Sequence, residues 1–144
     1  MRFLAILTVA TLAIAGCATS GLSPDTAAPL AYKAFGQDAI MYWVQGGDTM
    51  ISRAMTRVVP AGAPIVTNLK DVVSRGSKQS VRIAVAGTDS GFTAEVIKKA
   101  LGSVHDDVPN LHLLFIGNRT HEPEVRRAVE AKRGMFTFEE EASS

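Results

Sequence analysis

The stretch VRIAVAGTDSGFTAEVIKKALGSVHDDVPNLHLLFIG, residues 81–117, decides the fold class of this chain. It contains two short apolar runs, 81–86 and 111–116, which end at Gly87 and Gly117 respectively. Strands that are covered on both faces of a sheet are apolar along their whole length, whereas half-exposed strands alternate. The two runs therefore predict neighbouring strands buried inside an α/β layer.

A polar turn follows each run, and each turn leads into a segment with helical character, at 92–104 and at 122–132. The two segments resemble each other, because Glu95 and Glu124 each precede a valine and, shortly after it, two basic residues and an alanine. A strand, turn and helix repeated at about 30 residues matches the spacing that a parallel crossover requires. The sequence thus predicts tandem βα units.

Two further strands are expected on either side of this repeat. Met135–Phe138 follows a glycine near the C-terminus, and Ile65–Thr67 leads into a short helix at 69–73. The first of these would add a strand directly after the second predicted helix. Together the runs predict a sheet of three to four mostly parallel strands.

The N-terminal part of the domain has a different pattern. Residues 30–45 are apolar nearly all round and predict a buried helix, which two glycines at 46–47 end. A second helix is expected at 49–59, where apolar residues recur at helical spacing. The predicted fold is α/β, with this N-terminal helical hairpin packed on the sheet and a single domain over residues 30–138.

Composition excludes several classes of protein. The chain has 144 residues with one cysteine, 47% hydrophobic residues, and 15 Lys and Arg against 14 Asp and Glu. A lone cysteine excludes an internal disulfide framework and a thiolate zinc cluster. The near-neutral charge lacks the basic field on which nucleic-acid binding depends, so we predict no nucleic-acid partner.

Residues 1–16, MRFLAILTVATLAIAG, have the layout of an export signal. Arg2 supplies a positive charge near the start, and a run of about a dozen mostly apolar residues follows it. That run is shorter than the roughly 20 residues of a membrane-spanning helix. It ends in Ile14-Ala15-Gly16-Cys17, which resembles the lipobox of bacterial lipoproteins. An ordinary secretory signal with an incidental cysteine is the alternative.

The resemblance covers residues 1–17 only, and no family is recognised for the rest of the chain. It implies that Cys17 is lipidated and becomes the first residue after cleavage, with residues 17–29 as a flexible tether. In bacterial lipoproteins, an aspartate directly after the lipidated cysteine favours retention at the inner membrane. This chain has Ala18 at that position, so the resemblance implies that the protein lies at the periplasmic face of the outer membrane. Cleavage would remove Arg2 and no acidic residue, which leaves a neutral chain. Residues 139–144 are predicted to form an acidic, disordered tail.

The turns after the two central runs carry the candidate ligand site. The carboxyl ends of parallel strands share one edge of a sheet, and open α/β sheets bind ligands there. Asp89, Ser90, Arg119 and His121 would lie on this rim and could form an anion or acid/base site. The alternative is structural, because Asp89 or Ser90 can cap the following helix.

No motif for catalysis or metal binding stands out. The three histidines have no short ligand spacing, and no serine lies in a nucleophile-elbow motif. We therefore predict a protein without cofactor, metal or enzymatic activity. Ile40, Met41, Tyr42 and Trp43 form a candidate partner interface, because Trp, Tyr and Met are favoured at interface centres. Their alternative role is to cover the core.

The preferred hypothesis is a non-catalytic lipoprotein, held in the outer membrane by its acyl chains. It would bind other envelope proteins as a structural or assembly component of a secretion, conjugation or pilus machine. The alternative hypothesis is a periplasmic ligand-binding protein or enzyme that uses the rim.

Overall fold

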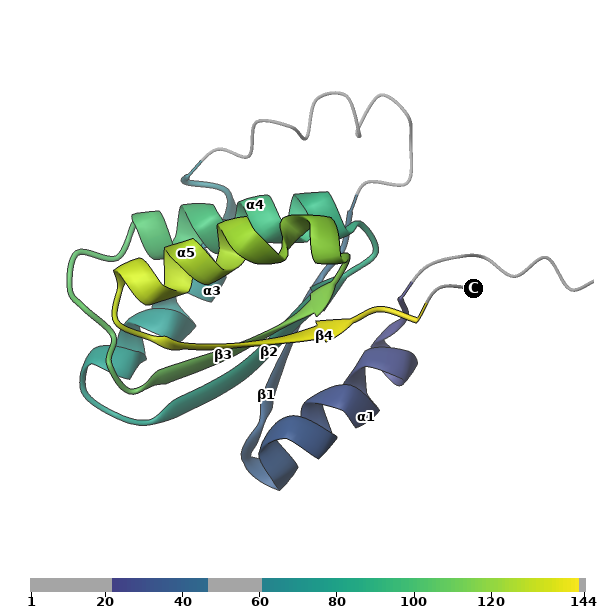
Figure 1. The fold of residues 1–144 in the computed structure, drawn as a ribbon. Helices are drawn as coiled ribbons and strands as arrows, with labels where there is room; N and C mark the ends of the chain where they lie inside the picture. Colours follow the sequence, from purple (N-terminus) through teal and green to yellow (C-terminus); the bar gives the residue numbers. More distant parts are fainter. Residues whose placement is uncertain (1–21, 47–60, 143–144) are drawn as a thin grey trace, which may run out of the picture.

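A four-stranded parallel sheet forms the centre of the computed structural model, which describes residues 22–46 and 61–142 (Figure 1). The strand order is β1-β2-β3-β4, and every neighbouring pair is parallel. The strands are β1 (Ile40–Val44), β2 (Val81–Gly87), β3 (Leu111–Gly117) and β4 (Met135–Glu140). The predicted α/β fold with a parallel sheet is confirmed.

Helices cover the two faces of the sheet unequally (Figure 1). Three helices lie side by side on one face: α3 (Pro64–Ser74), α4 (Ser90–Gly102) and α5 (Glu122–Ala131). Right-handed crossovers between strands in sequential order place every crossover helix on the same face. The other face is covered by α1 (Pro24–Phe35), which packs over β1, β2 and β3. Short 3-10 turns occupy Gly36–Asp38, Arg75–Ser77 and Arg119–His121.

Each central strand sends alternate side chains into two separate cores. Ile83 and Val85 of β2 pack against the three-helix layer, in a large buried cluster. Ala84 and Ala86 face the other way, into a smaller cluster under α1. Their short side chains let α1 approach the sheet closely, and Phe35 closes this cluster at the end of the helix. Both faces of β2 are therefore buried from Ile83 to Gly87, as the apolar sequence predicts, and Arg82 near the start of the strand is exposed.

The helix predicted at 30–45 is wrong in its second half. Gly36 has a φ of 71° and ends α1, and residues 40–44 then form a strand that pairs with β2. A left-handed residue directly after a helix favours glycine and stops the helix there. The helix expected at 49–59 lies outside the described residues, as do the predicted export signal and Cys17.

Three further boundaries also differ from the sequence predictions. Ile65–Thr67 belongs to α3 and not to a strand, because Pro64 occupies its first turn and Val66, Leu69 and Val73 lie on its buried side. The end of the expected tether is helical, since Ser23 caps α1 and the helix begins at Pro24. The first two residues of the expected tail, 139 and 140, belong to β4.

Candidate functional site

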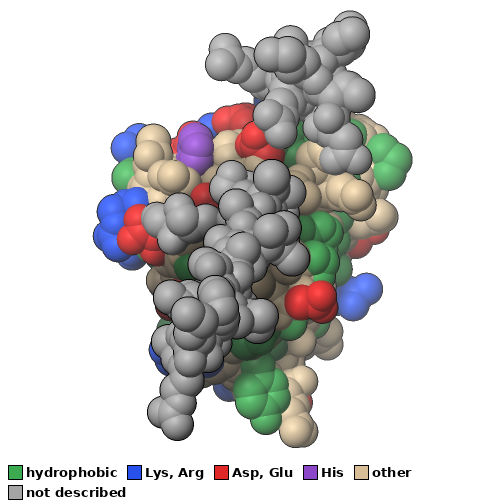
Figure 2. Space-filling model, turned by 90° about the vertical axis from the view of Figure 1, so that its right-hand side faces the viewer, with side chains coloured by type: hydrophobic (Ala, Val, Ile, Leu, Met, Phe, Trp, Pro, Cys, Tyr) green, Lys and Arg blue, Asp and Glu red, His purple; other side chains and the backbone are tan. Residues whose placement is uncertain are grey.

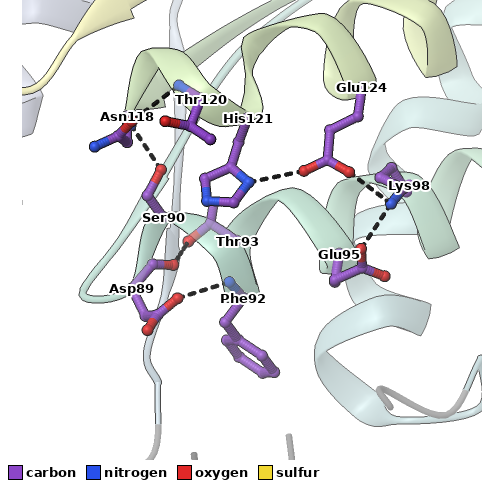
Figure 3. A network of polar contacts seen from close by, with 10 residues as sticks. All are labelled: Asp89, Ser90, Phe92, Thr93, Glu95, Lys98, Asn118, Thr120, His121 and Glu124. Atoms are coloured by element: carbon purple, nitrogen blue, oxygen red, sulfur yellow. Dashed lines mark hydrogen bonds and ion pairs between the residues drawn. The ribbon is translucent and has the colours of Figure 1, made fainter. Parts of the chain in front are cut away.

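The turns after β2 and β3 meet at the carboxyl edge of the sheet, as predicted (Figure 3). The backbone N–H of Asn118 donates a hydrogen bond to the Ser90 hydroxyl, with a nitrogen to oxygen distance of 2.7 Å. Ser90 is the first residue of α4, and Asn118 directly follows β3. One short contact thus joins two turns that lie 28 residues apart in the sequence.

Asp89 is the N-cap of α4. Its carboxylate accepts a hydrogen bond from the backbone N–H of Phe92 at 2.8 Å, and its backbone carbonyl accepts one from the Thr93 hydroxyl at 2.7 Å. A carboxylate at this position satisfies a free backbone donor and interacts favourably with the helix dipole. Of the two roles considered for Asp89, the structure places the side chain in the capping one.

The start of the same turn is tied to β1. The backbone N–H of Thr88 donates to the Val44 carbonyl at 3.2 Å, and the Thr88 hydroxyl accepts from the Gly46 N–H at 2.8 Å. Gly87 precedes this turn, and a side chain there would collide with the Val44 carbonyl and the Thr93 hydroxyl. The turn is therefore fixed from both sides, by β1 and by β3.

The side chain of Arg119 contacts β4. Its guanidinium donates to the Glu140 carboxylate at 3.0 Å and lies over the Phe138 ring, 5.6 Å from the ring centroid. The hydrogen bond to Glu140 raises the pKa of Arg119 above its ordinary value. The Arg119 side chain is two-thirds exposed, at 66%. Arg119 therefore lies in the turn after β3, but its side chain contacts the edge strand β4.

His121 begins a chain of ion pairs across α5 and α4 (Figure 3). Its Nδ1 lies 2.8 Å from Glu124, and the other oxygen of Glu124 accepts from Lys98 at 2.8 Å. Lys98 also donates to Glu95 at 2.6 Å. The two glutamates that occupy equivalent places in the sequence repeat thus share one lysine. This network was not predicted, although that equivalence indicated that both side chains lie on neighbouring helices.

Charges in this network shift each other's titration. Partial burial raises the pKa of Glu124, but hydrogen bonds from Lys98 and His121 outweigh it and bring the pKa below its ordinary value. Hydrogen bonds to Glu124 and Glu95 raise the pKa of Lys98. Both groups are therefore held in their charged forms near neutral pH.

The structure brings Asp89, Ser90 and His121 together (Figure 3), whereas the side chain of Arg119 contacts Glu140 and Phe138 of β4. A Cβ atom built on Gly91 would lie 3.2 Å from Nε2 of His121, so this nitrogen faces the first turn of α4. Figure 2 shows this edge of the molecule, with a histidine and charged side chains of both signs over the helix layer. Chemically, the rim offers one imidazole nitrogen beside a helix start at which the Asp89 carboxylate and the Ser90 hydroxyl have partners within the chain.

The four residues of the candidate interface do not share one face. Tyr42 packs against the three-helix core, and its hydroxyl donates to the Ile65 carbonyl at 2.6 Å. Burial raises the pKa of Tyr42. Met41 and Trp43 pack under α1, and Ile40 is 40% exposed at the start of the strand. These positions match the alternative role of covering the core, because successive side chains of β1 pack, partly buried, against the two opposite clusters.

Metal sites and membrane spans are both missing from the part of the chain that the structure describes. Across residues 22–46 and 61–142, no three His, Cys, Asp or Glu side chains cluster in a way that could hold a metal ion. Within these same ranges, no helix combines the length and the apolar character that crossing a membrane requires. No protein-family model, curated protein or solved structure matches this chain.

Proposed function

We propose that this protein is a lipoprotein of the bacterial outer membrane, anchored through acyl chains on Cys17. Its α/β domain would act at the periplasmic face as a non-catalytic structural or assembly component of a secretion, conjugation or pilus machine. The anchor is inferred from the export signal and the lipobox-like Ile14–Cys17. Several acyl chains, each contributing about 0.8 kcal/mol per buried methylene, hold such a protein firmly.

One observation carries the non-catalytic role: the polar rim side chains have partners within the chain. Asp89 caps α4, Ser90 binds the Asn118 backbone and Arg119 binds Glu140. A ligand that used the same atoms would have to compete with these contacts. The structural alternative considered for these residues therefore describes their contacts better than a ligand site does.

The position of α1 sets the orientation of the domain under this proposal. Cys17 lies six residues before Ser23, the N-cap of α1, and six residues extend over about 20 Å at most. The α1 layer is then the part of the domain nearest to the membrane. The α3, α4 and α5 layer covers the opposite face of the sheet and is available to envelope partners (Figure 1).

Photo-crosslinking in cells tests this orientation with a matched pair of positions. Lys33 and Lys99 are both exposed lysines in the last turn of a helix, one on α1 and the other on α4. A photoreactive residue at 99 should capture an envelope protein, and the same residue at 33 should not. Protein adducts from 33 alone would contradict the proposed orientation.

Mass spectrometry of the mature N-terminus tests the anchor separately. We expect a peptide that begins at Cys17 and carries the mass of acyl chains. An unmodified Cys17, or cleavage at another bond, would show that the lipoprotein assignment is wrong. The crosslinking result would still report which face of the domain binds other proteins, so the two parts of the proposal can fail independently.

The rim supports a second candidate function, a periplasmic ligand-binding protein or enzyme. The contact between Nδ1 of His121 and Glu124 orients the imidazole and leaves Nε2 toward Gly91, where it could exchange a proton with a ligand. The double variant Asp89→Ala, His121→Ala tests this candidate. If the double variant loses the function of the protein while its fold and its complexes stay intact, the result would favour a ligand-binding or enzymatic role of the rim. If the function is retained, that role would be excluded.

A further inference from the structure

β4 is an edge strand in the described part of the chain, and its outer backbone groups follow a fixed pattern. The N–H of Glu141 donates to the Gly117 carbonyl of β3 at 3.0 Å. Backbone groups of successive strand residues point to alternate sides. Residues 135, 137 and 139 therefore direct their amides to β3, while Phe136, Phe138 and Glu140 direct theirs outward.

Charges flank this edge in a self-complementary order. Lys132 and Arg133 precede β4, Glu139 and Glu140 end it, and Glu141 follows. The five residues between them, 134–138, are uncharged. If two copies of β4 run in opposite directions, the basic start of each strand lies beside the acidic end of the other. A parallel arrangement would place like charges side by side, which is unfavourable.

We propose that β4 pairs antiparallel with β4 of a second copy of this chain, so that the two sheets form one continuous sheet. The outward amides of 136, 138 and 140 allow a two-fold axis at Thr137, with Phe136 opposite Phe138 of the second copy. In this register Met135 lies opposite Glu139, and Arg133, in the turn before the strand with a φ of 61°, comes near the Glu141 that follows β4 of the second copy. An axis at Phe138 overlaps the strand equally but places no basic residue opposite an acidic one, and an axis at Phe136 overlaps fewer strand residues.

The surroundings of β4 leave room for such pairing. On one face α1 packs over β1, β2 and β3, and Met135 of β4 is 60% exposed. On the other face Arg126 lies over Phe136, 4.8 Å from the ring centroid, and binds Glu122 at 2.7 Å. Arg119 is similarly paired with Glu140. The arginines beside the edge are thus balanced by carboxylates of their own chain.

The other outer strand in the described residues, β1, lacks this pattern. Its sequence, Ile40–Val44, contains no charged residue, so nothing in it selects an antiparallel copy. A two-fold axis perpendicular to the sheet also keeps α1 of both copies on the same side. Two anchors that precede α1 could then enter one membrane, although the dimer itself does not depend on the anchor.

Charge reversal tests the proposal on the full chain in mild detergent. Sedimentation velocity over a range of concentrations should show a monomer and dimer in equilibrium. Arg133→Glu and Glu141→Arg should each weaken the dimer about tenfold, because each reverses two symmetric contacts, and the double variant should restore it. Arg133 also binds Asp107 at 3.2 Å, so Asp107→Asn serves as the control and should leave the dimer unchanged.

Disulfide crosslinking tests the register, with Cys17→Ser as the background so that only the introduced cysteine can react. In Thr137→Cys the two cysteines would face each other at a Cα separation of about 4.5 Å, which a disulfide can bridge. In Met135→Cys, the matched control on the same face, they would lie about 13 Å apart along the strands. We expect a covalent dimer from position 137 and not from 135.

Several results would overturn the proposal. A chain that remains monomeric at all concentrations, or equal crosslinking from positions 135 and 137, would show that β4 does not pair as described. Single charge reversals with no more effect than Asp107→Asn would exclude the role of the flanking charges. Crosslinking of the Thr137→Cys variant to another protein in place of a second copy would show that the edge binds a different partner.

Discussion

The hydroxyl of Ser90 accepts a hydrogen bond from the backbone N–H of Asn118 at 2.7 Å. This contact joins the first residue of α4 to the residue that follows β3, so it fixes the two rim turns relative to each other. The side chain that sequence analysis assigned to a ligand rim therefore also stabilises the turn geometry. Substitutions in these turns can separate the energetic roles of individual contacts.

Ser90→Ala should lower the free energy of unfolding by about 1 kcal/mol, because it removes the acceptor for the Asn118 N–H. Urea denaturation of the variant and the parent chain measures the difference. Ser103→Ala is the matched control. The Ser103 hydroxyl donates to the backbone carbonyl of Lys99 at the end of the same helix, and losing this bond should lower the free energy of unfolding by less. Equal losses in the two variants would contradict a special role for the contact between the turns.

Gly87→Ala should destabilise the protein by about 1–3 kcal/mol, the usual cost of overpacking a core. The added methyl group would meet the Val44 carbonyl, the Thr93 hydroxyl and the Val44 Cβ, the last at 2.9 Å. Gly102→Ala provides the control, since a Cβ there has no neighbour within 4 Å and alanine favours the helix. We expect the control to gain up to about 1 kcal/mol in urea denaturation, and a loss there would refute this explanation.

The two central strands could be predicted from sequence because their environment is uniform. Residues 83–87 and 113–117 are buried on both faces, so these stretches are apolar throughout and end at glycines that begin the turns. The repeat of about 30 residues then determines parallel pairing. These features depend on local composition and spacing, which a sequence displays directly.

The outer elements could not be predicted as well, because short apolar runs suit either a strand or a helix. Residues 40–44 are apolar throughout, and only their aromatic and β-branched content and the preceding Gly36 favour a strand. Ile65–Thr67 is β-branched, but Pro64 and the later helical spacing place it in α3. In α3 the packing of Val66, Leu69 and Val73 overrides the local preference for a strand, whereas residues 40–44 follow theirs.

The topology of the sheet predicts which residues share the candidate rim, but it does not predict which side chains contact each other there. Parallel strands bring Asp89, Ser90 and His121 to one edge, as expected. The hydrogen-bond partners of these side chains depend on the rotamers that the side chains adopt in the folded protein. The spacing of residues along the sequence does not determine those rotamers. Neither the Ser90 contact with Asn118 nor the link between Lys98 and Glu124 has a signal in the turns themselves.

Ala86→Leu should disturb the packing of α1 on the sheet. Ala86 is fully buried in the cluster that contains Ala27, Ala31 and Phe35 of α1, so a larger side chain would push the helix outward. We expect a loss of about 1–3 kcal/mol in unfolding free energy and faster proteolysis within α1. Ala34→Leu places the same side chain on an exposed position of α1 and should change stability by less than about 0.5 kcal/mol. Similar effects from both variants would show that contact with Ala86 does not position α1.

His112 connects the α1 layer to β4. Its Nε2 lies 2.7 Å from the Thr137 hydroxyl, and the Phe35 ring meets it edge to face with centroids 4.6 Å apart. Burial lowers the pKa of His112 below its ordinary value of 6.5, and the positive charge of Arg82 lowers it further. The folded protein therefore binds a proton at this site less readily than the unfolded chain does.

Because the pKa of His112 is lower in the folded state, its contribution to stability is present above pH 6.5 and is lost as the pH falls below that value. We expect the unfolding free energy from urea titrations to decrease between about pH 7.5 and about pH 5.5. His112→Gln keeps a side chain that can bind Thr137 but cannot titrate, so it should reduce this decrease. His105→Gln, at an exposed turn, should retain the full decrease. An unchanged pH dependence in His112→Gln would show that protonation of other groups weakens the fold, and the contact between α1 and β3 would then be insensitive to pH in this range.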